Sequence, residues 1–160
     1  MPRFEDIKKE AIKFRGLLDA CDKKNTELVT EDFPICNCKL ASLLLIYHFL
    51  KIWPSIEITG VQGIAKDKSG EDVISHYWVE INDIAIDITA DQYNLLDSEL
   101  LNDVIISHRP FKAAYIESKF SFLAYELFRV TGRDTYEKGF SYIGEDVIEG
   151  MSLGYAQLTK

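Results

Sequence analysis

The chain has 160 residues, a length that fits one domain and leaves little room for two. Apolar residues make up 47% of the sequence and charged residues 28%, an ordinary globular mixture that excludes a disordered tail or a collagen-like repeat. The 18 basic and 26 acidic residues give a net charge of −8, which argues against a nucleic-acid or anionic-membrane partner, because phosphate binding needs a basic face. We therefore treat residues 1–160 as a single domain.

The cysteine content and the start of the chain predict a cytoplasmic protein with free thiols. Three cysteines are an odd number, so a closed disulfide framework is not expected. The first residues form a charged amphipathic pattern without the apolar core of a secretory signal, and the longest apolar stretch, residues 43–50, is far short of a membrane span. Export without a classical signal would also fit this sequence.

Two helices are predicted in the first third of the chain. At residues 4–24, apolar residues recur at helical spacing and Lys and Glu fill the opposite side, which is typical of an amphipathic surface helix. At residues 38–51, apolar residues cover nearly the whole circumference, as expected for a buried helix. Asn37 is a suitable N-cap for this second helix.

The middle of the chain predicts an antiparallel sheet. Residues 56–62, 73–81 and 84–89 are rich in β-forming side chains, and Asn82-Asp83 indicates a hairpin turn between the last two segments. A further strand is predicted at 104–107, whereas 120–130 fits either a strand or a buried helix. Residues 132–144 are predicted as loop and 145–158 as a last helix. The layout is therefore α+β.

Cys38 is the first candidate for chemistry because it opens the predicted buried helix. There its sulfur would lie near unpaired N–H groups and the positive end of the helix dipole, which favour a thiolate over a thiol. The same N–H groups could stabilise an oxyanion. The alternative is that Cys38 is a small buried hydrophobic residue, the commoner role of a free cysteine.

His76 and Asp87 are predicted to share one face of the sheet. A two-residue turn at 82–83 pairs Val79 with Ile86, so the apolar residues of both strands form one face and His76 and Asp87 lie diagonally on the other. Diagonal neighbours are within reach of each other's side chains. A carboxylate there could orient the imidazole and stabilise its protonated form. Asp87 also interrupts an apolar strand, where aspartate is disfavoured without a partner.

Three segments between residues 33 and 93 carry a recognisable pattern. FPICNCKLASLLL at 33–45 is similar to F-P-x-G-x-C-x-x-A/T-S-x-L-L. SHYWVE at 75–80 and IDITADQY at 86–93 are similar to S-H-A-W-L/V-E and I-D-I-T-A-D-Q-F. The middle of the chain therefore resembles a family of small bacterial and phage transglutaminase-like proteins.

This resemblance implies a papain-like (transglutaminase-core) fold, in which a buried helix bearing Cys38 packs on an antiparallel sheet. It also implies a catalytic triad in which Cys38 is the nucleophile, His76 the base and Asp87 the residue that orients the base. Cys36 stands where the family usually has glycine, so its side chain would crowd the site or present a second thiol. The substrate implied by the resemblance is a protein or peptide.

Further residues around the thiol are candidates for substrate binding or for an oxyanion hole. The backbone N–H of Cys38 is the expected donor, with the side chain of Asn37 or Gln92 as a second one. Gln92 suits a structural role equally well. Trp78 is more typical of packing, although a tryptophan beside a thiol can line a tunnel for an acyl acceptor.

Zinc binding is a weaker alternative for the two neighbouring cysteines. Cys36 and Cys38 could ligate zinc together with His48 or His76, but the CxC spacing is not the usual CxxC and a second close pair is missing. His48 lies in the predicted buried helix, where a core histidine is the ordinary interpretation. We therefore expect no metal and no cofactor.

The sequence thus predicts an enzyme that carries out thiol-dependent acyl transfer or hydrolysis on amide bonds, as a cysteine protease, a deamidase or a transglutaminase does. The rival interpretation is a papain-like fold of reduced activity that acts as a protein-binding or regulatory module. Cys36 in place of glycine motivates this rival.

Overall fold

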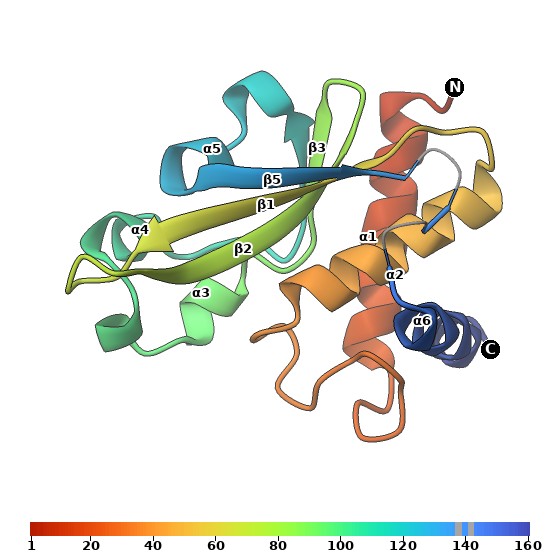
Figure 1. Cartoon of the computed structure of the whole chain (residues 1–160), viewed down its shortest axis with the longest axis horizontal. Coiled ribbons are helices and arrows are strands. Elements are labelled where there is room, and N and C mark those ends of the chain that lie inside the picture. The colour runs from red at the N-terminus through yellow and green to blue at the C-terminus, as the bar shows by residue number, and fades with distance from the viewer. Residues whose placement is uncertain (137–138, 141–142) are drawn as a thin grey trace.

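The computed structural model of the chain describes residues 1–136, 139–140 and 143–160 (Figure 1). Its fold is α+β, as the sequence predicts, with a five-stranded antiparallel sheet that is covered on both faces. The main elements in chain order are α1 (Phe4–Ala20), α2 (Cys38–Ile52), β1 (Thr59–Lys66), β2 (Asp72–Ile81), β3 (Ile84–Asp87), α3 (Gln92–Leu95), α4 (Asp103–Ser107), β4 (Tyr115–Ser118), α5 (Ala124–Leu127), β5 (Arg129–Thr135) and α6 (Glu145–Leu158). Two 3-10 turns, at Ser98–Leu100 and Lys119–Ser121, complete the order.

The strands are arranged in the spatial order β4-β3-β2-β1-β5, and every neighbouring pair is antiparallel. Ile81 pairs with Ile84 and Val79 with Ile86, so the predicted two-residue hairpin and its register are confirmed. The central strand β2 is almost entirely buried over its second half, because both of its faces are covered. A side chain on either face of β2 is therefore shielded from water.

One face of the sheet packs against α1, α2 and α6, which lie together on one side of the molecule (Figure 1). Helix α2 supplies an unbroken run of buried residues from Ala41 to Ile46, in agreement with its predicted buried position. The residues of β2 and β3 that the register assigns to one apolar face, among them Val79 and Ile86, join this core. Among the described residues, no helix is both long and apolar enough to cross a lipid bilayer.

The opposite face is covered by the chain that runs from β3 to β5, including α3, α4 and α5. Trp78 and Ile74 of β2 point into this second core, where aromatic residues are frequent. Since the side chains of a strand alternate between its two faces, His76 and Glu80 point the same way. The second core therefore encloses the predicted catalytic histidine.

Several predicted elements differ from the structure. The first helix ends at Ala20, four residues early, and the expected strand at 104–107 is helix α4, which Asn102 caps by accepting a hydrogen bond from the N–H of Ile105. Strand β4 was not predicted. Residues 120–130 contain helix α5 and then the start of a strand.

The predicted loop at 132–144 is a strand up to Thr135, and residues 137–138 and 141–142 of it lie outside the described part of the chain. The sequence does not predict strand β5, because most of its side chains are exposed and polar and no apolar alternation marks it. Backbone pairing with β1 rather than an apolar pattern defines it.

Candidate thiol active site

His76 and Asp87 form a buried pair between two neighbouring strands. Nε2 of His76 lies 2.6 Å from Oδ2 of Asp87, and the two residues are only 1% and 2% exposed. The other carboxylate oxygen of Asp87 accepts a hydrogen bond of 3.0 Å from the N–H of Thr89. The predicted diagonal contact is therefore present, and a backbone donor fixes the carboxylate that makes it.

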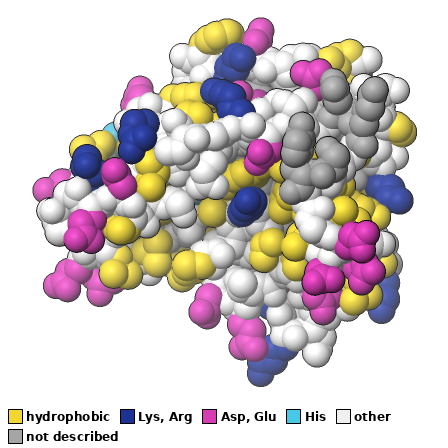
Figure 2. Space-filling view, viewed as in Figure 1, with side chains coloured by type: hydrophobic (Ala, Val, Ile, Leu, Met, Phe, Trp, Pro, Cys, Tyr) yellow, Lys and Arg dark blue, Asp and Glu magenta, His cyan; other side chains and the backbone are white. Residues whose placement is uncertain are grey.

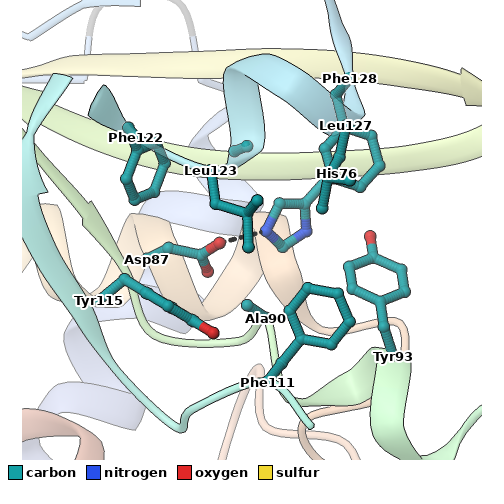
Figure 3. A pocket seen from close by; sticks show the side chains of 11 residues that line it. His76, Asp87, Ala90, Tyr93, Phe111, Tyr115, Phe122, Leu123, Leu127 and Phe128 are labelled. Atoms are coloured by element: carbon teal, nitrogen blue, oxygen red, sulfur yellow. Dashed lines mark hydrogen bonds and ion pairs between the residues drawn. The ribbon is translucent and has the colours of Figure 1, made fainter. Parts of the chain in front are cut away.

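Aromatic side chains enclose the imidazole. Phe128 stacks on the His76 ring with centroids 5.2 Å apart, and Tyr93 meets it edge-on at 5.3 Å (Figure 3). The cavity beside His76 and Asp87 offers only about 10 Å³, the space of about one water molecule. The hydrogen bond between them is thus largely shielded from bulk solvent, which strengthens its electrostatic component.

The ionisation of His76 reflects this environment. Burial is the largest single effect and lowers the pKa of the imidazole, but the charge and hydrogen bond of Asp87, together with Cys38, raise it by more in sum. The resulting pKa of His76 is about 10. At neutral pH the ring is therefore a cation whose Nε2–H is donated to Asp87.

Cys38 is the first residue of α2 and lies close enough to His76 to raise the pKa of the imidazole. Because Asp87 holds Nε2 of His76, Nδ1 is the ring nitrogen that remains to serve the thiol, and Gln92 also approaches it. Cys38 is partly buried and lines a surface groove of about 470 Å³. The structure thus places Cys38, at the edge of the groove, near the buried pair of His76 and Asp87.

Gln92 links the thiol loop to the imidazole. Its Oε1 accepts a hydrogen bond of 3.3 Å from the N–H of Cys36, which turns its Nε2 toward His76 Nδ1 at 3.4 Å. Gln92 is buried at the first position of α3 and also lines the groove. It is therefore both a structural residue and an N–H donor directed at the site.

Asn37 does not serve the site as predicted. Its side chain makes no capping hydrogen bond to α2; its Oδ1 accepts from the backbone N–H of Thr30 at 2.9 Å, and its Nδ2 donates to the carbonyl of Leu28 at 3.0 Å. In the preceding loop, Asn37 uses both its amide oxygen and its amide nitrogen in hydrogen bonds. A helix cap would use only the oxygen and would leave the buried nitrogen without an acceptor. Asn37 therefore orders the loop that presents the two cysteines.

Trp78 packs in the core, which is the role that the sequence favoured over a place in substrate binding. Its side chain is fully buried in the second core and does not border the groove. Its Nε1–H donates to Glu80, a buried carboxylate that also receives hydrogen bonds from Arg133 and from the hydroxyl of Tyr125. Trp78 therefore helps to hold Glu80 within the second core.

The cluster of Glu80, Tyr125 and Arg133 was not predicted. Arg133 donates to Glu80 at 3.0 Å and to the Tyr125 hydroxyl at 2.8 Å, so the three groups close a triangle. Tyr125 belongs to α5, whose neighbours Leu123 and Phe128 wall the cavity over His76. The sequence clue to this cluster is Glu80 itself, because a glutamate on a buried strand face needs hydrogen-bonding partners.

Cys36 has an unusual backbone conformation. Its φ is +54°, in the left-handed region where glycine is favoured, which gives a physical reason for the glycine typical of the similar motif. Its side chain is exposed and lines the same groove as Cys38. A side chain is therefore accommodated at this position, and it brings a second thiol to the site.

Arg15 supports the site from α1, a role that no pattern in the sequence indicated. Its guanidinium makes two hydrogen bonds of 2.7 Å to the carboxylate of Asp91 and one of 2.7 Å to the carbonyl of Ile88. These partners lie between Asp87 and Gln92. Arg15 therefore holds the segment that carries two of the candidate residues.

His48 lies apart from this site, with its own partners. Nε2 of His48 lies 2.9 Å from Glu10 and Nδ1 lies 2.9 Å from the hydroxyl of Tyr155. The interpretation of His48 as a core histidine is confirmed. In the part of the chain that the structure describes, no three His, Cys, Asp or Glu side chains are grouped as metal ligands.

The chain matches no protein-family model, no curated protein and no solved structure. Its function is therefore inferred from the chemistry of the site itself.

Proposed function

We propose that this protein is a thiol-dependent enzyme that transfers or hydrolyses acyl groups of amide bonds in a protein or peptide substrate. Cys38 is the nucleophile, His76 the general acid and base, and Asp87 the residue that positions the imidazole. The proposal includes a papain-like fold and kinship with the transglutaminase-like proteins that the motifs resemble. A deamidase, a protease and a transglutaminase share this chemistry up to the acyl-enzyme.

The observation that carries the proposal is the buried contact between His76 and Asp87, with Cys38 near the same imidazole. A protonated imidazole beside a thiol favours the thiolate, which is the reactive form. The position of Cys38 at the start of a helix of 15 residues adds the favourable end of the helix dipole. The groove gives a substrate access to the sulfur.

The steps follow from these positions. The Cys38 thiolate attacks the carbonyl carbon and forms a tetrahedral oxyanion, toward which the N–H of Cys38 and Nε2 of Gln92 can donate. His76 gives its Nδ1 proton to the leaving amine as the C–N bond breaks, leaving an acyl-enzyme. Water or a second amine then attacks the acyl carbon, His76 takes its proton, and the thiolate is released.

Alkylation with iodoacetamide at pH 6, followed at each cysteine by mass spectrometry, tests the nucleophile. Cys38 should react at least about tenfold faster than Cys21, since an ordinary thiol is almost fully protonated at that pH. His76→Gln should remove this advantage. His48→Gln is the matched control, because His48 is also a buried histidine beside a carboxylate, and it should leave the rate unchanged.

Equal and slow alkylation of Cys21, Cys36 and Cys38 would contradict the enzyme and favour the binding module instead. If Cys38 is selectively reactive, glutamine-containing peptides should be assayed for ammonia release with and without a primary amine. Incorporation of the amine indicates a transglutaminase, ammonia release alone a deamidase, and backbone cleavage a protease. No turnover of a broad peptide library by the reactive protein would count against an amide substrate.

A further inference from the structure

Two of the three cysteines, Cys36 and Cys38, line the same groove. Cys36 is exposed, Cys38 is partly buried, and both line the same surface depression. The third thiol, Cys21, lies just after α1, where its Sγ donates to the carbonyl of Leu18 at 3.2 Å. The groove therefore contains a pair of thiols and leaves the third one outside.

The backbone between the two cysteines is bent. Cys36 has a φ of +54°, and Asn37 has φ −116° and ψ 8°, which is far from an extended strand. Fully extended residues would separate the two Cα atoms by about 7 Å, whereas a bend at Asn37 shortens that span into the range that disulfides bridge. The bend therefore shortens the backbone span that a disulfide between Cys36 and Cys38 would have to bridge.

Tyr93 borders the same groove as the two cysteines. Burial is the main reason why the pKa of its hydroxyl is raised well above the usual value, and the charges of Cys38, Asp87 and Cys36 raise it further. Cys36, Cys38 and Tyr93 therefore share one groove.

We propose that Cys36 and Cys38 form a peroxide-sensitive pair, in which Cys36 converts oxidised Cys38 into an intramolecular disulfide. This inference goes beyond the proposed function and depends on it only for the greater reactivity of Cys38. The disulfide removes the nucleophile from the groove reversibly. It makes the site an oxidant-regulated one.

The chemistry requires hydrogen peroxide and no other oxidant. The Cys38 thiolate attacks one peroxide oxygen, the O–O bond breaks, and hydroxide leaves and takes a proton, giving a sulfenic acid and water. The Cys36 thiolate then attacks the Cys38 sulfur, the S–O bond breaks, and the second hydroxide leaves as water after protonation. Two thiols lose two electrons and two protons in all, and one peroxide becomes two waters.

The test follows the fate of Cys38 at a peroxide excess high enough to consume it in every variant. In the wild-type protein two of the three thiols should be lost, and the peptide that contains residues 36–38 should be lighter by two hydrogen atoms and restored by dithiothreitol. Cys36→Ser should abolish this product and convert Cys38 into sulfinic and sulfonic acids. Cys21→Ser is the matched control and should behave as the wild type.

Two results would overturn the proposal: the same yield of sulfinic Cys38 in the wild type and in Cys36→Ser, or a disulfide that joins Cys21 or a second chain. The yield of disulfide measures the role of Cys36, whereas the rate at which Cys38 is consumed measures its reactivity. A slow reaction that still ends in the disulfide would weaken the proposed enzyme and leave this inference intact. A fast reaction that ends in sulfinic acid would support the reactivity of Cys38 and contradict the disulfide.

Discussion

Arg15 of α1 and Asp91, which follows β3, are joined by two parallel hydrogen bonds of 2.7 Å. The Arg15 side chain is only 8% exposed, and it donates to two backbone carbonyls as well. Arg15→Met leaves these acceptors without a donor in a site that water scarcely reaches, so we expect a loss of about 3 kcal/mol in the free energy of unfolding. Urea denaturation measures it.

Arg3→Met provides the comparison for that measurement. Arg3 also pairs with an aspartate, Asp6, but both side chains are exposed. Exposed pairs contribute little, so this variant should unfold like the wild type. Similar losses in the two variants would show that burial of the Arg15 pair is unimportant.

The stability of the protein should depend on pH through His76. Its pKa of about 10 in the folded state exceeds the value of about 6.5 expected in the unfolded chain, so folding takes up a proton between these values. The stabilisation is complete below about pH 6.5 and is lost as the pH rises toward 10. Urea unfolding across this range should show the decline, and Asp87→Asn should flatten it. A wild-type profile as flat as that of the variant would contradict the pairing.

Asp87→Asn should also slow the chemistry without abolishing it. An amide cannot balance the imidazolium charge and favours the wrong tautomer, so alkylation of Cys38 or turnover should fall by about 10²–10⁴-fold. Cys38→Ala should abolish turnover with the fold retained, and Cys36→Ala should not. Wild-type rates in Asp87→Asn would show that Asp87 has no role in the reaction. An inactive Cys36→Ala would show that Cys36, and not Cys38, is the nucleophile.

The buried carboxylate of Glu80 should hold α5 in place over the second core. Glu80→Gln loses the charge that pairs with Arg133, and we expect a cost of about 1–3 kcal/mol. Amide hydrogen exchange at residues 122–128 should speed up, because these residues cover His76 and are tied to Glu80 through Tyr125. Faster exchange throughout the chain, with no preference for this segment, would argue against a local anchor.

Two helical glycines should respond in opposite ways to alanine. A Cβ at Gly154 of α6 would lie 2.5 Å from the carbonyl oxygen of Glu27, so Gly154→Ala should separate α6 from the loop after α1 and cost about 1–3 kcal/mol. A Cβ at Gly16 of α1 would meet no atom within 4 Å, so Gly16→Ala should stabilise the protein by about 0.5–1 kcal/mol. Thermal unfolding of both variants gives the comparison, and a stabilising Gly154→Ala would show that α6 does not pack this closely.

Sequence reasoning succeeded where periodicity and local geometry decide the structure. The hairpin turn at Asn82-Asp83 fixed the register of β2 and β3, and that register brought His76 to Asp87. The all-round apolar pattern of α2 identified its burial in the same way. Each of these inferences needed only residues that are close in the sequence.

The missed features depend on contacts between distant segments. Asn37 looks like a helix cap, but the carbonyl of Leu28 and the N–H of Thr30 compete for its amide, and nothing at position 37 reveals them. Arg15 lies 76 positions from Asp91, so no local pattern marks it as part of the site's support. Short elements such as α4 and β4 are set by the same kind of long-range packing.

The polar side chains of β5 affect whether the edge of the sheet can pair with a strand of another chain. Strand β5 ends the sheet on one side, where unpaired backbone groups could recruit another chain. Arg129, Arg133 and Asp134 place charges along this edge, and the pairing with β1 shifts register near Gly63. Acidic and basic side chains are likewise interspersed over the face shown in Figure 2. Charged and irregular edges oppose pairing with further strands, so we expect the β5 edge to resist edge-to-edge association between molecules.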